Sequence, residues 1–271
     1  MIDFATALWN HRNDLVDSKN RIKELFEAVN RPVDLRFPDW IQLYSLVLEF
    51  SPDLIIELGR GYGNSTCLFT EAVNRSGKGK VVSVGYDAEH AWKKTTVPAL
   101  QKLISPQWLD KLSIKQQDIM KTDFTEILDK SERVLIFWDA HGKELAQHII
   151  AHLFPLLQNK EHLIVMHDVT DMGNSVPATP PENDAPKIFR IKNLASTFEE
   201  IIPLFEFFST NGISCDSLRE SINRFIRKNE QTLPNKIKEL KNTWNELLDD
   251  HEPTERSHMI YFDINNKTNK G

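Results

Sequence analysis

Five short apolar runs, separated by segments with helical spacing, constrain the fold of this chain more than any other feature. The runs cover residues 54–58, 81–86, 112–118, 134–139 and 162–168. Apolar runs of this length are typical of parallel strands that are buried on both faces of a sheet. The segments between them, 64–75, 88–104, 122–130 and 143–158, have the pattern of helices. This alternation predicts right-handed crossovers and therefore an α/β fold with a doubly wound, Rossmann-like parallel sheet.

The regions that flank these runs have other patterns. Residues 1–36 predict a helical cap, and residues 37–50 predict a helix that starts at Pro38 and Asp39. We therefore expect a main domain over 37–271. Within it we expect a loop at 169–187, two further strands at 204–210 and 258–264, and a helical insertion over 211–256.

Composition excludes several classes of protein. The chain has 271 residues, of which 40% are hydrophobic, and a formal net charge of -6, which argues against general nucleic-acid binding. No apolar run approaches the ~20 residues that cross a bilayer, so no membrane partner is expected. The two cysteines form no CxxC pair and indicate no disulfide scaffold. A soluble, cytoplasmic protein is the expectation from these features.

Acidic residues follow the predicted strands at their carboxyl ends. Each run ends at an acid or continues to one just beyond it: Glu57, Asp87, Asp118, Asp139 and Asp168. In open α/β sheets, ligands bind at the carboxyl ends of the parallel strands. The acids therefore predict a ligand site at one edge of one sheet.

Three alternating glycines follow the first of these acids and narrow the choice of ligand. They are Gly59, Gly61 and Gly63. Dinucleotides prefer the spacing GxGxxG, whereas position 64 is asparagine here. Glu57 would repel a pyrophosphate and suits a ligand that carries positive charge. A dinucleotide-dependent oxidoreductase is therefore only the alternative interpretation.

Three motifs together carry a resemblance to a known family. "ELGRGYGNST", "LIFWDAHG" and "HLIVMHDV" resemble the corresponding motifs of class I S-adenosylmethionine-dependent methyltransferases, in the branch of macrocin O-methyltransferase and cephalosporin-hydroxylase-like proteins. The resemblance covers roughly residues 40 to 170. It implies a seven-stranded sheet with an antiparallel last strand, and methylation of an oxygen, such as a sugar or natural-product hydroxyl, on a small-molecule acceptor. It leaves open whether the chain forms a homo-oligomer.

The resemblance also implies a set of cofactor contacts. Glu57 would contact the methionine part of S-adenosylmethionine, directly or through water, and the three glycines would let the backbone approach it. The other implied contacts are with Ser65, Asp87, Gln117, Asp118 and Ile119. Ser65, with Thr66, is equally consistent with capping the next helix. Gly85 stands where the family commonly has the acid that binds the ribose, so either Asp87 takes the ribose in a shifted register or this contact is lost.

The last two motifs imply the catalytic groups, namely Asp139, His141 and His167. In metal-dependent relatives, carboxylates at these strand ends hold a divalent ion, here Asp139 and Asp168 with Mg²⁺. A third ligand would be Asp171, His141 or water. Without a metal, His141 or His167 would be the general base. The loop 169–187 would cover the acceptor pocket or form one wall of it. "DAHG" departs from the family pattern, and with Gly85 it keeps open a non-catalytic, cofactor-binding relative that serves as an interaction module.

Overall fold

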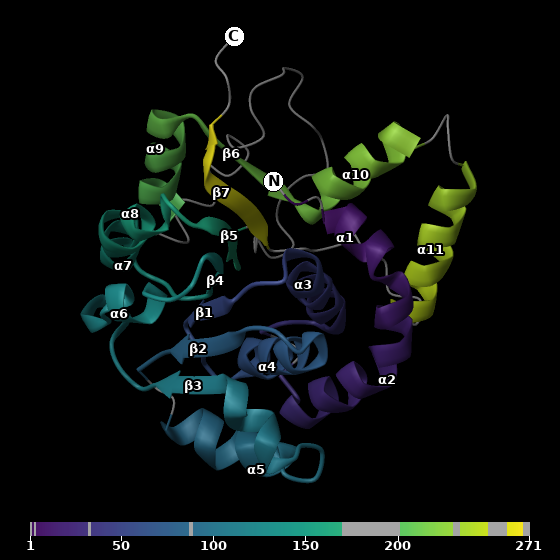
Figure 1. Cartoon of the computed structure of the whole chain (residues 1–271), viewed down its shortest axis with the longest axis horizontal. Helices are drawn as coiled ribbons and strands as arrows, with labels where there is room; N and C mark the ends of the chain where they lie inside the picture. The colour runs from purple at the N-terminus through teal and green to yellow at the C-terminus, as the bar shows by residue number, and fades with distance from the viewer. Residues whose placement is uncertain are drawn as a thin grey trace, which may run out of the picture.

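The computed structural model describes residues 2, 4–31, 34–86, 89–169, 201–229, 234–248 and 259–267 of the chain. One seven-stranded sheet forms its centre, with the strand order β3-β2-β1-β4-β5-β7-β6. Figure 1 shows helices on both sides of this sheet. The predicted α/β fold with a doubly wound sheet is confirmed, and the sheet has the seven strands that the resemblance implies.

Six of the seven strands lie close to predicted runs, and β6 does not. The strands are β1 (Leu54–Leu58), β2 (Lys80–Val84), β3 (Leu112–Lys115), β4 (Arg133–Trp138), β5 (Glu161–Met166), β6 (Ile213–Ser217) and β7 (Ile260–Lys267). The first five pair in parallel, whereas β7 is antiparallel to both of its neighbours, β5 and β6. The predicted antiparallel last strand is therefore confirmed.

The helices fall into two groups, one on each face of the sheet (Figure 1). The first group contains α1 (Phe4–Asn10), α2 (Arg12–Val29), α3 (Phe37–Phe50), α4 (Asn64–Ser76), the π-helix η1 (Glu89–Thr96), α5 (Val97–Leu100), the 3₁₀ helix η2 (Pro106–Lys111), α10 (Leu218–Asn229) and α11 (Pro234–Leu248). The second contains the 3₁₀ helix η3 (Ile119–Lys121), α6 (Phe124–Leu128), α7 (Lys143–His148), the π-helix η4 (Ile149–Leu153), α8 (Phe154–Leu157) and α9 (Ile201–Asn211).

The central strands are buried on both faces, as their continuously apolar sequences predict. Along β4, Leu135 and Phe137 pack into the core under the first group of helices. Their neighbours Ile136 and Trp138 point the other way, into the core under the second group. Because successive side chains of a strand alternate between faces, one short apolar run supplies both cores.

The predicted N-terminal cap is helical and packs on its own chain. α1 contacts α3 and α10, and α2 contacts α3, α4 and α11. Phe4 meets Trp244 edge to face at 6.4 Å between ring centroids. The backbone N–H of Ala5 donates to Ser221 Oγ at 2.8 Å. The N-terminal helices and the predicted helical insertion therefore form one outer layer over α3 and α4, which Figure 1 shows as an arc.

The strand predicted at 204–210 is wrong, because these residues lie inside helix α9. Leu204 and Phe208 are both buried, and their spacing of four residues puts them on one face of the helix. A short apolar run does not distinguish a buried strand from a buried helix by periodicity. The actual sixth strand, β6, follows after Gly212, whose φ of 64° ends the helix. β6 lies at the start of the region predicted to be wholly helical, at 211–256.

The sequence indicated no disulfide scaffold and no membrane-spanning segment. Cys67 and Cys215 are both free. Within the described ranges, every helix is too short or too polar to pass through a membrane.

Candidate active site

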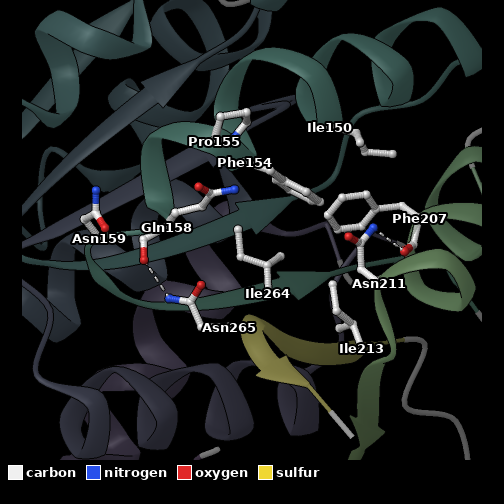
Figure 2. Close-up of a pocket in the computed structure, with 10 residues that line it drawn as sticks. All are labelled: Ile150, Phe154, Pro155, Gln158, Asn159, Phe207, Asn211, Ile213, Ile264 and Asn265. Carbon is white, nitrogen blue, oxygen red and sulfur yellow. Dashed lines mark hydrogen bonds between the residues drawn. The ribbon is translucent and has the colours of Figure 1, made fainter. Parts of the chain in front are cut away.

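Two cavities of similar size differ in their chemistry. One, of about 370 Å³, lies between η4, α8, α9 and strands β6 and β7, and Figure 2 shows the ten residues that line it. None of these ten has an ionisable side chain, and two of the amides are engaged with backbone carbonyls, Asn265 with Gln158 and Asn211 with Phe207. This cavity lies toward the amino end of β5, because the neighbouring Ile264 N–H donates to His162. It offers no groups for acid–base chemistry.

The other cavity, of about 360 Å³, is a cleft at the carboxyl ends of β1, β4 and β5. It brings together the glycine loop and the acids and histidines that end β4 and β5. The lining residues are Asp34, Leu35, Arg60, Gly61, Tyr62, Asn64, Ser65, Asp139, His141, His167 and Asp168. Five of these, Asp34, Leu35, Arg60, Tyr62 and Asn64, were not predicted as site residues. This cleft is the candidate active site.

The glycine loop turns sharply between β1 and α4. Gly59 has a φ of 94°, and a Cβ built there would lie 2.1 Å from the carbonyl oxygen of Asp139. Only glycine allows the loop to pass this close to the end of β4. Gly61, with a φ of 49°, has open space around it and faces the cleft. Gly63 precedes α4 as its N-cap residue.

Glu57 lies behind the cleft and does not line it. Its carboxylate is fully buried and accepts hydrogen bonds from the hydroxyls of Ser65, Thr66 and Ser83. Burial raises the pKa of Glu57, and the three hydroxyl donors and the charge of Arg60 act in the opposite direction. The hydroxyl of Ser65 thus separates Glu57 from the cleft.

The predicted helix capping by Ser65 and Thr66 is wrong. Helix α4 begins at Asn64 after the N-cap Gly63, and no side chain caps it. The two hydroxyls bond Glu57 instead. Ser65 and Thr66 lie two and three positions after the N-cap Gly63, whereas a capping side chain must precede the first helical residue.

The buried side chain of Arg60 reaches from the glycine loop to the end of β2. Its guanidinium donates to the carbonyl of Ser83 at 2.9 Å and to the carbonyl of Gly85 at 3.2 Å. Burial lowers the pKa of Arg60, while the charge of Glu57 opposes this. The position where the family commonly has an acid is therefore a glycine covered by an arginine. Asp87, the residue proposed in its place, lies outside the described residues.

A group of acids and histidines ends β4 and β5. His167 Nδ1 lies 3.0 Å from a carboxylate oxygen of Asp139 and 3.1 Å from one of Asp168. His141 Nε2 lies 3.5 Å from the other oxygen of Asp168. Burial lowers the pKa of His167, but the hydrogen bonds and charges of the two aspartates outweigh it and raise the pKa to about 10. At neutral pH His167 is therefore an imidazolium that holds both carboxylates.

One further acid faces this group from the N-terminal region. Asp34, which precedes α3, lines the cleft and is exposed at its edge. Asn64 fixes the segment around it, because its side-chain amide donates to the carbonyls of Arg31 and Leu35 at 2.8 and 3.3 Å. Asp34 belongs to no sequence pattern with a known role, so only the fold reveals that it lies beside Asn64 at this cleft.

Three of the predicted cofactor contacts, Gln117, Asp118 and Ile119, lie elsewhere on the sheet edge. Ile119 is buried in the core beneath the second group of helices. Gln117 donates to Thr122, and Asp118 caps the short helix η3 by accepting from the N–H of Met120. None of the three lines the cleft. Asp171 and residues 170–187 of the predicted loop lie outside the described residues.

Comparison with known protein families identifies the family of this chain. The family model described as Rhamnosyl O-methyltransferase/CmcI matches residues 20–187, more than half of the chain. The chain belongs to this family. The Rhamnosyl O-methyltransferase/CmcI family is a branch of the class I S-adenosylmethionine-dependent methyltransferases, so the resemblance seen in the three motifs is confirmed. Membership favours the methyltransferase interpretation over the dinucleotide-dependent oxidoreductase.

Solved structures of methyltransferases are similar to the chain at low identity. CmcI in its apo form is 15% identical with a TM-score of 0.45, covering 66% of this chain and 63% of CmcI. CmcI described as Mg-SAM is 17% identical with a TM-score of 0.41, covering 64% and 61%. The SAH-bound methyltransferase PaMTH1 of Podospora anserina is 15% identical with a TM-score of 0.49, covering 72% and 81%. The chain thus spans about three fifths of CmcI. A search of curated proteins gives no match.

The cleft has suitable residues for a divalent cation and for S-adenosylmethionine. Asp139, His141 and Asp168 each offer a ligand atom, and these atoms all lie within 4.8 Å of one another. Two carboxylates and an imidazole suit a divalent cation. The open space around Gly61 lets a cofactor approach the backbone of the glycine loop.

Proposed function

We propose that this protein transfers the methyl group of S-adenosylmethionine to a hydroxyl oxygen of a small molecule, such as a sugar or natural product, with the help of a divalent cation such as Mg²⁺. One observation carries the proposal. A single cleft is lined both by Gly61 of the glycine loop and Ser65 of α4, and by the ionisable group Asp139, His141 and Asp168. Family membership supports the cofactor and the transfer to oxygen.

In this proposal the glycine loop binds the cofactor, and the residues at the strand ends bind and activate the acceptor. S-adenosylmethionine, when bound, supplies a methyl group that its sulfonium has already activated. The glycine loop binds the cofactor through Gly61, which has no Cβ to obstruct the approach. The protein then has to align the acceptor oxygen with the methyl carbon and receive the proton of the hydroxyl.

The acids at the strand ends prepare the acceptor. A divalent cation, when bound, lowers the pKa of a hydroxyl that it binds. Asp139 and Asp168 would hold this cation, with His141 as a third ligand. His167 donates between the two carboxylates and fixes their positions. In a metal-free reaction, His141 is a better general base than His167, because His167 is already protonated at neutral pH.

Calorimetry tests the cofactor first. S-adenosylmethionine is titrated into the purified protein with and without Mg²⁺, and NAD and NADP serve as controls. We expect S-adenosylmethionine to bind with a micromolar dissociation constant, within the usual range for enzyme substrates, and NAD and NADP not to bind. Sugar and natural-product hydroxyls are then screened for production of S-adenosylhomocysteine. Failure to bind S-adenosylmethionine at millimolar concentration would contradict the proposal.

Replacing Asp139 with asparagine tests the cation. We expect the dissociation constant of Mn²⁺, used as the probe, to rise at least about 10-fold, because even indirect partners of a metal site contribute that much. Methyl transfer to an acceptor found in the screen should fall about 10²- to 10⁴-fold, as for loss of general-base assistance. Asp110→Asn, an exposed aspartate in η2, is the matched control. Unchanged Mn²⁺ binding in Asp139→Asn would exclude Asp139 as a ligand.

The same experiments address a non-catalytic relative. Gly85, covered by Arg60, is the observation that favours this second candidate. S-adenosylmethionine binding without methyl transfer to any acceptor would support it. Production of S-adenosylhomocysteine that depends on an added acceptor would exclude it.

A further inference from the structure

We infer that Asp34, rather than Glu57, is the carboxylate that binds the ammonium group of the cofactor's methionine part. The inference rests on the proposed function, since it names a residue for the same cofactor. It assigns a specific role to the N-terminal segment, which no sequence motif predicted.

Glu57 cannot be reached from the cleft. Its side chain is 0% exposed, and the hydroxyls of Ser65, Thr66 and Ser83 already donate to its two oxygens. A ligand cation would have to displace Ser65 and break part of this network. Fully hydrogen-bonded buried groups resist such exchange, because each broken bond leaves a buried donor without a partner.

Three other carboxylates line the cleft, and two of them are engaged. Asp139 and Asp168 share the proton of His167, at 3.0 and 3.1 Å. They are also the residues proposed to hold the cation. Asp34 is the third, and no described residue donates a hydrogen bond to its carboxylate. It lies outside the compact group of ligand atoms that Asp139, His141 and Asp168 form.

The electrostatics of the cleft favour a cation beside Asp34. Partial burial raises the pKa of Asp34, and the negative charges of Asp139 and Asp168 raise it further, against Arg31 and His167. Asp34 therefore lies in an excess of negative charge. A ligand ammonium group placed between these acids would relieve their mutual repulsion.

Asp34 is held at the cleft by the glycine loop itself. Asn64, the first residue of α4, donates to the carbonyls of Arg31 and Leu35 on either side of Asp34, and it accepts from the indole N–H of Trp40. The guanidinium of Arg31 also stacks on the ring of Tyr62 in the loop, 3.6 Å from its centroid. The wall that carries Asp34 and the loop that approaches the cofactor are thus one unit.

Three ligands distinguish the contribution of the ammonium group to binding from that of the rest of the cofactor. S-adenosylmethionine has both a sulfonium and an ammonium, S-adenosylhomocysteine keeps only the ammonium, and 5′-methylthioadenosine has neither. Each is titrated by calorimetry into wild type, Asp34→Asn, and the control Asp17→Asn, an exposed aspartate of α2. Circular dichroism checks that all three proteins are folded.

We expect Asp34→Asn to weaken the first two ligands equally, by about 10-fold, the lower range for a charge-assisted hydrogen bond at an exposed group. 5′-Methylthioadenosine should bind all three proteins alike. Weakening of S-adenosylmethionine alone would assign Asp34 to the sulfonium and overturn the inference. Equal weakening of all three ligands, or of none, would also overturn it. If wild type binds none of the ligands, both the proposed function and the inference are wrong. If wild type binds S-adenosylmethionine and Asp34→Asn binds it equally well, only the inference is wrong.

Discussion

Replacing Glu57 with alanine is expected to lower the free energy of unfolding by about 3–5 kcal/mol, the usual cost of breaking a buried ionic network by removing one partner. The substitution leaves the hydroxyls of Ser65, Thr66 and Ser83 without their common acceptor. It also removes the negative charge that lies near the buried guanidinium of Arg60. Urea denaturation followed by circular dichroism measures the loss.

Two further variants sharpen this measurement. Glu57→Gln keeps the shape and one acceptor oxygen, so it should be less destabilised than Glu57→Ala. Glu24→Ala, an exposed glutamate of α2, should change stability by no more than about 0.5 kcal/mol. If Glu57→Ala unfolded within about 1 kcal/mol of wild type, a net value no larger than one ordinary hydrogen bond, Glu57 would not organise this network.

Replacing Gly59 with alanine is expected to have the second large effect. The new Cβ would lie 2.1 Å from the carbonyl oxygen and 2.7 Å from the carbonyl carbon of Asp139, so no side-chain rotation can relieve the contact. Overpacking costs about 1–3 kcal/mol, and the left-handed conformation adds about 1–2 kcal/mol. Because the clash displaces Asp139, Mn²⁺ binding should weaken together with stability.

Gly61→Ala is the matched control for this prediction. Gly61 also has a positive φ, of 49°, but no described residue lies within 4 Å of a Cβ built there. It should show only the cost of the left-handed conformation and keep its affinity for Mn²⁺. Equal losses in both variants would show that contact between the loop and β4 does not contribute.

The sequence predicted the parts of the structure that depend on local pattern. The apolar runs located five strands because a strand buried on both faces needs a continuous apolar sequence. The strand-end acids Asp139 and Asp168 were placed together because parallel strands end at one edge of a sheet. The run at 204–210 failed because its apolar residues satisfy helical and extended patterns equally, and the second core selected the helix.

The other wall of the cleft could not be predicted in this way. Asp34 and Asn64 are separated by 30 positions in the sequence, and their meeting depends on how α3 packs on α4. Likewise, whether Glu57 faces the cleft or the interior depends on Ser83, which comes from another strand. Such contacts follow from tertiary packing, which local propensity and spacing do not encode.

The outer layer of helices has a consequence for biosynthesis. α1 is held by α10 through contacts such as that between Ala5 and Ser221, which lie 216 positions apart. On the ribosome, α1 and α2 therefore emerge long before α10 and α11 can cover them. Contacts between residues this far apart in the sequence form slowly. Until they form, the apolar surface of α1 and α2 is exposed and is a target for chaperones. A translating chain halted before residue 218 should leave Phe4 without Trp244, the ring that it meets in the completed fold.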